Sequence, residues 1–95
     1  MMIKIAIVED EDMHAEELIK CLRRFENEVH QNLVCTRYKD AISFLNEKVK
    51  VYDVVFMDII MPGINGMVAA ERMRRTNSQT ILIFVTNMLN YAVKS

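Results

Sequence analysis

The apolar positions of this chain change their spacing several times along its length. Residues 3–8 are almost wholly apolar and rich in β-branched side chains, a pattern typical of a strand buried on both faces of a parallel sheet. From Asp12 onward, apolar residues recur at helical spacing for about 18 residues, with charged side chains on the opposite face. This second pattern predicts an amphipathic helix, and Asp12 is the residue expected to cap its N-terminus.

The alternation between these two patterns continues along the chain. Further strands are expected at residues 33–38, 54–57 and 80–85, and further helices at residues 40–48, 67–75 and 87–95. Strands that alternate with helices form right-handed crossovers, which produce a mostly parallel sheet with helices on both faces. We therefore predict an α/β fold with a doubly wound parallel sheet, in one domain that spans residues 1–95.

Turn-forming residues are scarce in this chain and gather in one place. The single proline and both glycines lie within residues 62–66, between the third expected strand and the third expected helix. At Gly66 we expect a backbone conformation, or a close approach of another group, that a side chain would forbid.

Composition narrows the class of protein. With 52% hydrophobic and 26% charged residues, the chain is too apolar for a disordered protein and too charged for a membrane protein. Its apolar runs are far shorter than the roughly 20 residues that span a bilayer, and no signal-peptide pattern opens it. We therefore expect a cytoplasmic protein with no membrane partner. The net charge of −1 and the lack of a basic stripe argue against direct binding of nucleic acid.

The cysteines and histidines show no spacing that suggests a metal site. Cys21 and Cys35 fall on an expected helix and an expected strand, so buried, reduced thiols are the better interpretation than a disulfide. His14 and His30 have no partner at ligand spacing, and we expect both to be surface residues.

Polar residues follow three of the expected strands. Glu9 and Asp10 come after the first strand, Asp58 after the third and Thr86 after the fourth. Ligands of open parallel sheets bind outside the carboxyl ends of the strands. If these three strands are neighbours, the four residues converge on one crevice.

Each acid taken alone is better explained as a helix cap or a solvated turn residue. Together they favour a binding site, because carboxylates repel by about 4 kcal/mol per pair at about 4 Å and an effective dielectric constant of about 20. Such a crevice requires a cation. Oxygen ligands with no cysteine or histidine nearby favour Mg²⁺ or Mn²⁺ over zinc.

These motifs resemble a known family over the whole chain. VEDE at residues 8–11, DIIMPGING at residues 58–66 and VT at residues 85–86 are similar to the receiver domain of bacterial two-component response regulators. The segment TNMLNYA at residues 86–92 further resembles receivers that precede LytTR-type DNA-binding domains. The resemblance implies a flavodoxin-like sheet with strand order 2-1-3-4, in which the family's fifth strand and last helix are missing and the domain is incomplete at its C-terminus.

The resemblance also implies a role for each site residue. Asp58 would accept a phosphoryl group from a sensor histidine kinase or a small acyl phosphate. Asp10 would bind Mg²⁺ directly, with Asp58 and the backbone carbonyl of Ile60. Glu9, which replaces the commoner aspartate, would assist directly or through water. Thr86 would donate a hydrogen bond to the phosphoryl group. The family's fifth-strand lysine has no counterpart here, because Lys94 lies in an expected helix.

The expected output is a switch in an effector or dimer surface, with transcription as the regulated process, rather than turnover of a substrate. DNA would be contacted only through an effector domain that these 95 residues do not include. The alternative is a phosphorylation-silent interaction module with the same fold. A phosphatase of the haloacid-dehalogenase type is disfavoured, because Ile60 stands where its second acid would be. The apolar strand at residues 80–85 would form an exposed sheet edge, so we also expect self-association through it.

Overall fold

The computed structural model describes residues 2–46, 51–61, 63–76 and 79–85. Strands and helices alternate along it as the hydrophobic pattern predicts. In chain order the elements are β1 (Met2–Val8), α1 (Asp12–Val29), β2 (Asn32–Tyr38), α2 (Ala41–Leu45), β3 (Val54–Asp58), α3 (Gly66–Thr76) and β4 (Ile81–Val85). The helix expected at residues 87–95 lies outside the described residues.

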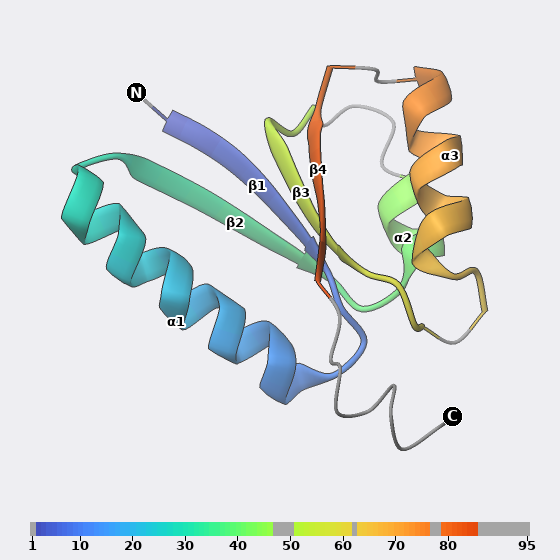
Figure 1. Cartoon of the computed structure of the whole chain (residues 1–95), viewed down its shortest axis with the longest axis horizontal. Coiled ribbons are helices and arrows are strands. Elements are labelled where there is room, and N and C mark those ends of the chain that lie inside the picture. The colour runs from blue at the N-terminus through green and yellow to red at the C-terminus, as the bar shows by residue number, and fades with distance from the viewer. Residues whose placement is uncertain (1, 47–50, 62, 77–78, 86–95) are drawn as a thin grey trace.

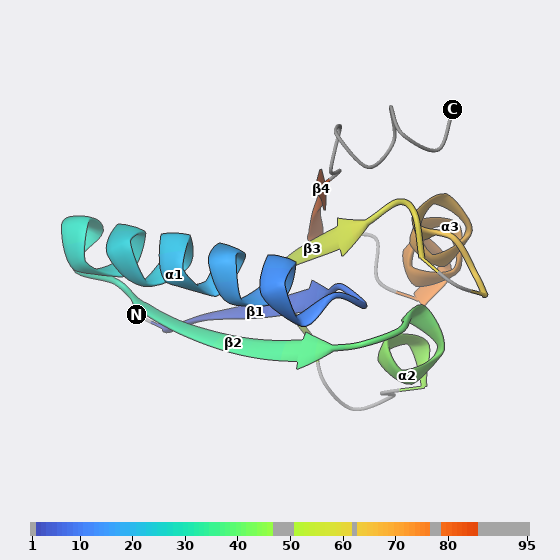
Figure 2. The same ribbon diagram turned by 90° about the horizontal axis from the view of Figure 1, so that it is seen from below.

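The strands form one parallel sheet in the order β2-β1-β3-β4. α1 covers one face of this sheet, and α2 and α3 cover the other (Figures 1 and 2). α1 and α3 connect adjacent strands, whereas the crossover through α2 carries the chain past β1 to β3, and all four strands run parallel. The predicted α/β fold and strand order are confirmed over the four described strands.

The core consists of two apolar layers, one on each face of the sheet. Successive side chains of a strand point to opposite faces, so β1 supplies both layers. Ile5 and Ile7 pack toward α1 with Leu22 and Leu33. Ala6 and Val8 pack on the other side in a larger cluster, whose members from the helices and loops are Ala41, Phe44, Tyr52, Met61, Ala69 and Met73. Burial on both faces explains why residues 3–8 are almost continuously apolar.

Two predicted element boundaries need correction. The N-cap of α1 is Glu11, whose side chain makes no capping hydrogen bond, and Asp12 is the first helical residue instead. Arg37 explains this, because its guanidinium pairs with the Asp12 carboxylate and draws that side chain toward β2. Asp58 is the last residue of β3 rather than the first residue after it.

Both cysteines are free thiols, but neither is fully buried. Cys35 is half-buried on β2, and burial raises the pKa of its thiol. Cys21 is exposed on α1, which corrects the prediction that both thiols are buried. Among the described residues, no helix is long and apolar enough to cross a membrane.

Candidate functional site

The acidic residues predicted to share a crevice meet at the carboxyl ends of β1 and β3. Val8 and Met57 are paired across these neighbouring strands, so Glu9 and Asp58, the next residues along each chain segment, emerge side by side. One carboxylate oxygen from each of Glu9, Asp10 and Asp58 lies within 4.8 Å of the other two. Glu9 and Asp10 are far from Asp58 in the sequence, and the parallel pairing of β1 with β3 brings the three residues together.

The Glu9 carboxyl has an unfavourable electrostatic environment. Its residue is only 8% exposed, although it directly follows a strand at the sheet edge where loops begin. Burial is the largest cause that raises the pKa of Glu9, followed by the hydrogen bond and negative charge of Asp58, and together they bring it to about 7. Burial and the neighbouring carboxylate therefore favour the protonated form of Glu9.

His14 contacts this cluster, which corrects the prediction of a surface histidine without a partner. Its Nδ1 lies 3.0 Å from Glu9 Oε1 and 3.4 Å from Glu11 Oε2. Partial burial acts to lower the pKa of His14, but the hydrogen bond with Glu9 and the nearby carboxylates raise it overall. The sequence held a signal for this contact, because residues in the first turn of a helix lie close to the strand end that precedes it.

The loop after β3 holds Asp58 in place. The Ile60 N–H donates to Asp58 Oδ1 at 3.2 Å, and the Gly66 N–H donates to the Ile59 carbonyl at 2.9 Å. Gly66 packs so tightly that a Cβ there would lie 2.3 Å from the Asp58 carbonyl oxygen. The predicted close approach at Gly66 is confirmed. The role of the Ile60 carbonyl stays a prediction, and Thr86 and Lys94 lie outside the described residues.

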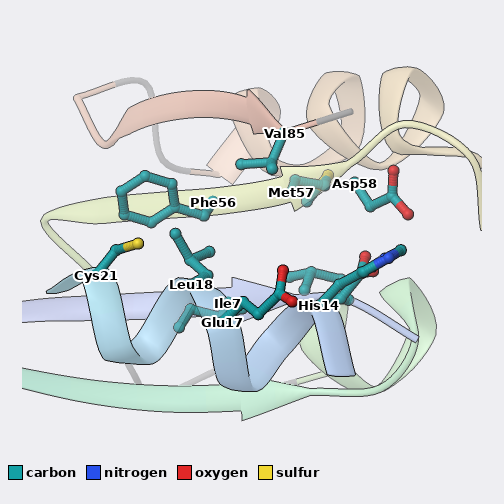
Figure 3. A pocket seen from close by; sticks show the side chains of 11 residues that line it. Ile7, His14, Glu17, Leu18, Cys21, Phe56, Met57, Asp58 and Val85 are labelled. Carbon is teal, nitrogen blue, oxygen red and sulfur yellow. The ribbon is translucent and has the colours of Figure 1, made fainter. Parts of the chain in front are cut away.

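A groove of about 500 Å³ leads away from the acidic cluster, between α1 and the β3–β4 part of the sheet. Figure 3 shows His14 and Asp58 at one end of this groove and Cys21 and Phe56 at the other. The polar end is lined by Glu9, His14 and Asp58, whereas Leu18, Phe56, Met57 and Val85 make the rest largely apolar. The end formed by the strand termini therefore suits a small, hard, charged ligand better than the apolar part does.

A family model described as "Response regulator receiver domain" matches residues 5–95. The chain belongs to this family. Curated relatives of the receiver include the sensory transduction protein LytT of Oceanobacillus iheyensis, 35% identical over 100% of this chain, and LytT of Bacillus subtilis, 27% identical over 99%. The receiver spans 38% of the length of each of these relatives.

Solved receiver structures share the fold. The response regulator TrrA of Thermotoga maritima, in complex with Mg²⁺-BeF, is 25% identical and gives a TM-score of 0.68 over 97% of this chain and 76% of its own. The BeF₃-activated DrrB receiver domain is 23% identical and gives a TM-score of 0.74 over 90% of this chain and 67% of its own. The latter likeness concerns the fold alone.

The acidic cluster is consistent with a receiver magnesium site. Carboxylate oxygens are the hard ligands that Mg²⁺ prefers, and the cluster brings three of them together. The expectation that no histidine lies near the oxygen ligands was wrong, since His14 contacts Glu9 of the cluster. Sequence reasoning also missed Arg37, which binds the backbone of Glu9 from β2.

Proposed function

We propose that this receiver is the phosphoacceptor of a two-component phosphorelay, with Asp58 taking a phosphoryl group from a sensor histidine kinase. The observation that carries the proposal is the convergence of the Glu9, Asp10 and Asp58 carboxylates at the carboxyl ends of β1 and β3. A lone acid at a strand end has many structural explanations. Three acids with a buried member, brought together by sheet topology, have few explanations other than cation-assisted chemistry on an anion.

In the proposed reaction a carboxylate oxygen of Asp58 attacks phosphorus. The new P–O bond forms as the P–N bond to the donor histidine breaks, and the imidazole leaves with the electron pair. Phosphoryl transfer depends mainly on positioning and on neutralising charge. Mg²⁺ held by Asp10, Asp58 and Glu9, with the Ile60 carbonyl as a further proposed ligand, would supply that neutralisation when bound.

The residues of this chain supply the positioning. The Ile60 N–H fixes one Asp58 oxygen, and the contact of Gly66 with the Asp58 backbone fixes the loop. Thr86, which follows β4 beside β3, is proposed to donate a hydrogen bond to the transferred group. Because Asp58 ends a rigid central strand, the nucleophile is held without a large entropic cost at the moment of reaction.

Incubation with acetyl phosphate and Mg²⁺, followed by intact-mass measurement, tests the proposal directly. One added phosphoryl group per chain is the expected result. A protein that stays unlabelled by acetyl phosphate and by a phosphorylated kinase would contradict the proposal and favour the phosphorylation-silent interaction module.

We further propose a transcriptional output. The LytT relatives are named sensory transduction proteins, and the receiver accounts for 38% of their length. We infer that a parent protein would couple this receiver to an effector domain that contacts DNA. We propose that the receiver itself carries the phosphorylation chemistry and that DNA is contacted only through that effector domain.

We also propose that the 95-residue chain self-associates through β4. β4 pairs with β3 along one edge, and within the described residues its other edge has no partner strand. Its alternate residues Ile81, Ile83 and Val85, which share one face of the sheet, are 59%, 41% and 40% exposed. An apolar edge with no charge or proline is a template for pairing with a second copy, most simply as a two-fold dimer.

Ile83→Lys should shift this equilibrium toward monomer, because a charged side chain on the edge strand opposes close pairing. Light scattering at micromolar concentration should report a dimer or larger species for the parent. Val34→Lys is the matched control, since Val34 is 45% exposed on β2, the opposite edge strand. A monomeric parent, or equal dissociation by both variants that circular dichroism shows to be folded, would contradict pairing through β4.

A pH dependence follows from the environment of Glu9. Its pKa in the folded protein is about 7, above the ordinary 4.5, so between these values the folded state holds a proton that the unfolded state has lost. Stability from this group therefore falls as pH rises through that window. In EDTA, the free energy of unfolding of the parent should fall between pH 5 and pH 8. In Glu9→Gln this fall should be smaller by on the order of 1–3 kcal/mol.

Urea denaturation at the two pH values measures this effect. Glu28→Gln is the control, because Glu28 is an exposed glutamate near the other end of α1. If the free energy of unfolding falls equally in the parent and in Glu9→Gln between pH 5 and pH 8, Glu9 does not cause the pH dependence.

A further inference from the structure

Arg37 holds the loop that carries two of the three clustered acids. It lies on β2, paired in register with Ile7 of β1, and its side chain is 20% exposed. Its Nε and Nη2 donate to the Glu9 backbone carbonyl at 3.1 and 2.9 Å. Its Nη1 donates to the Asp12 carboxylate at the start of α1. One guanidinium therefore ties together both ends of the segment that contains Asp10.

Residues of β2 form hydrogen bonds with both the N–H and the carbonyl of Glu9. Its N–H donates to the Tyr38 carbonyl at 3.0 Å, and its own carbonyl accepts from Arg37. The Glu9 side chain faces the other way, toward His14 and the neighbouring Asp58. The position of the Glu9 and Asp10 carboxylates relative to Asp58 thus depends on a contact made on the far side of β1.

We propose that Arg37 is a positioning residue that sets the cation affinity of the Glu9, Asp10 and Asp58 cluster by fixing the loop from Glu9 to Asp12. This inference rests on the proposed function. Groups behind the ligands of a metal site orient those ligands, and loss of such a group typically costs about 10- to 100-fold in metal affinity. Arg37 acts on the backbone of the ligand loop and touches neither the cation nor the phosphoryl donor.

Charge and position predict opposite outcomes at this residue, which makes the proposal testable. Loss of a positive charge near an acidic cluster would, by electrostatics alone, strengthen cation binding. Loss of the loop contact would weaken it, because Glu9 and Asp10 would sample arrangements that do not converge with Asp58. The sign of the change in affinity therefore separates the two effects.

The chain offers a matched control in Arg23. Its Nη1 donates to the Leu33 carbonyl at 2.8 Å and to Glu26 at 3.2 Å. It thus also joins α1 to β2 through a backbone carbonyl and a helix carboxylate, but at the other end of these elements. Arg23→Met removes the same chemistry as Arg37→Met without disturbing the loop at Glu9.

The test measures Mn²⁺ binding by electron paramagnetic resonance, with Mg²⁺ as competitor, at a temperature where every variant is folded. Arg37→Met should weaken binding about tenfold, whereas Arg23→Met should leave it within about twofold of the parent. Arg37→Lys keeps the charge but loses the planar set of donors, so its affinity should fall between those of the parent and Arg37→Met. Asp10→Ala gives the reference for a lost ligand.

Amide exchange in the metal-free protein adds a second readout. The Glu9 amide should exchange faster in Arg37→Met than in Arg23→Met. Unchanged or tighter Mn²⁺ binding in Arg37→Met, or equal weakening by both arginine variants, would overturn the positioning role alone. A parent protein that binds no Mn²⁺ would overturn the proposed function together with it, so the two failures are distinguishable.

Discussion

Asp58→Asn should abolish labelling of the protein by acetyl phosphate and Mg²⁺. The substitution keeps the size of the side chain and an oxygen that can accept the Ile60 N–H, but it removes the negatively charged nucleophile. Intact-mass measurement should show complete loss of the phosphoryl adduct. Peptide mapping of the labelled parent should place the adduct on the segment that contains Asp58.

The variant should be folded, which makes the loss interpretable. Asp58 raises the pKa of the buried Glu9 through its hydrogen bond and charge, so a neutral asparagine should relieve repulsion rather than disturb the core. Asp53→Asn is the control. Asp53 lies just before the other end of β3, where its side chain accepts a hydrogen bond from the Lys4 N–H. Undiminished labelling of Asp58→Asn, or equal loss in Asp53→Asn, would show that Asp58 is not the acceptor.

Gly66→Ala should cause a large loss of stability. The added Cβ would lie 2.3 Å from the Asp58 carbonyl oxygen and 2.8 Å from the Ile59 Cα, and neither backbone atom can rotate away. Gly66 is the first residue of α3, so the preference for alanine over glycine in helix interiors offsets little of this steric conflict. Overpacking in a rigid site costs about 3 kcal/mol. For a domain of this size, that corresponds to a fall in Tm of about 12–24 °C.

Gly63→Ala isolates the cost of backbone conformation from the cost of the clash. Gly63 has φ +82°, and a Cβ there meets no atom within 4 Å. Its loss should be smaller, about 1–2 kcal/mol, because only the left-handed backbone conformation opposes the side chain. Thermal denaturation followed by circular dichroism measures both. Equal Tm values for Gly66→Ala and the parent would mean that the start of α3 can move away from the β3 loop.

Much of the fold could be predicted because its signals are local. The apolar run at residues 3–8 requires burial on both faces, and a strand in the middle of a parallel sheet provides it. The 18 residues of α1 show helical spacing from Asp12 to Val29. Element boundaries were harder to predict where a residue distant in the sequence takes part. At the start of α1, the Asp12 side chain pairs with Arg37 on β2 instead of capping the helix.

The candidate site was predictable only in part. Glu9, Asp10 and Asp58 could be grouped because carboxyl ends of parallel strands meet at one edge of the sheet. For His14 the sequence held only the general signal that the first turn of a helix lies near the preceding strand end, because the contact with Glu9 depends on how that turn leaves β1. Arg37 could not be assigned to the site, because a residue 28 positions away reaches the Glu9 carbonyl only once β1 and β2 pair in register.

The sequence by itself determined the alternation of strands and helices, the acids that end β1 and β3, and the need for glycine at residue 66. These depend on side-chain periodicity and on backbone sterics, which are properties of short segments. Tertiary structure alone decided the pKa of Glu9, the exposure of Cys21, and the grip of Arg37 on the acidic loop. These depend on burial and on contacts between distant segments, which exist only when the sheet and its covering helices have assembled.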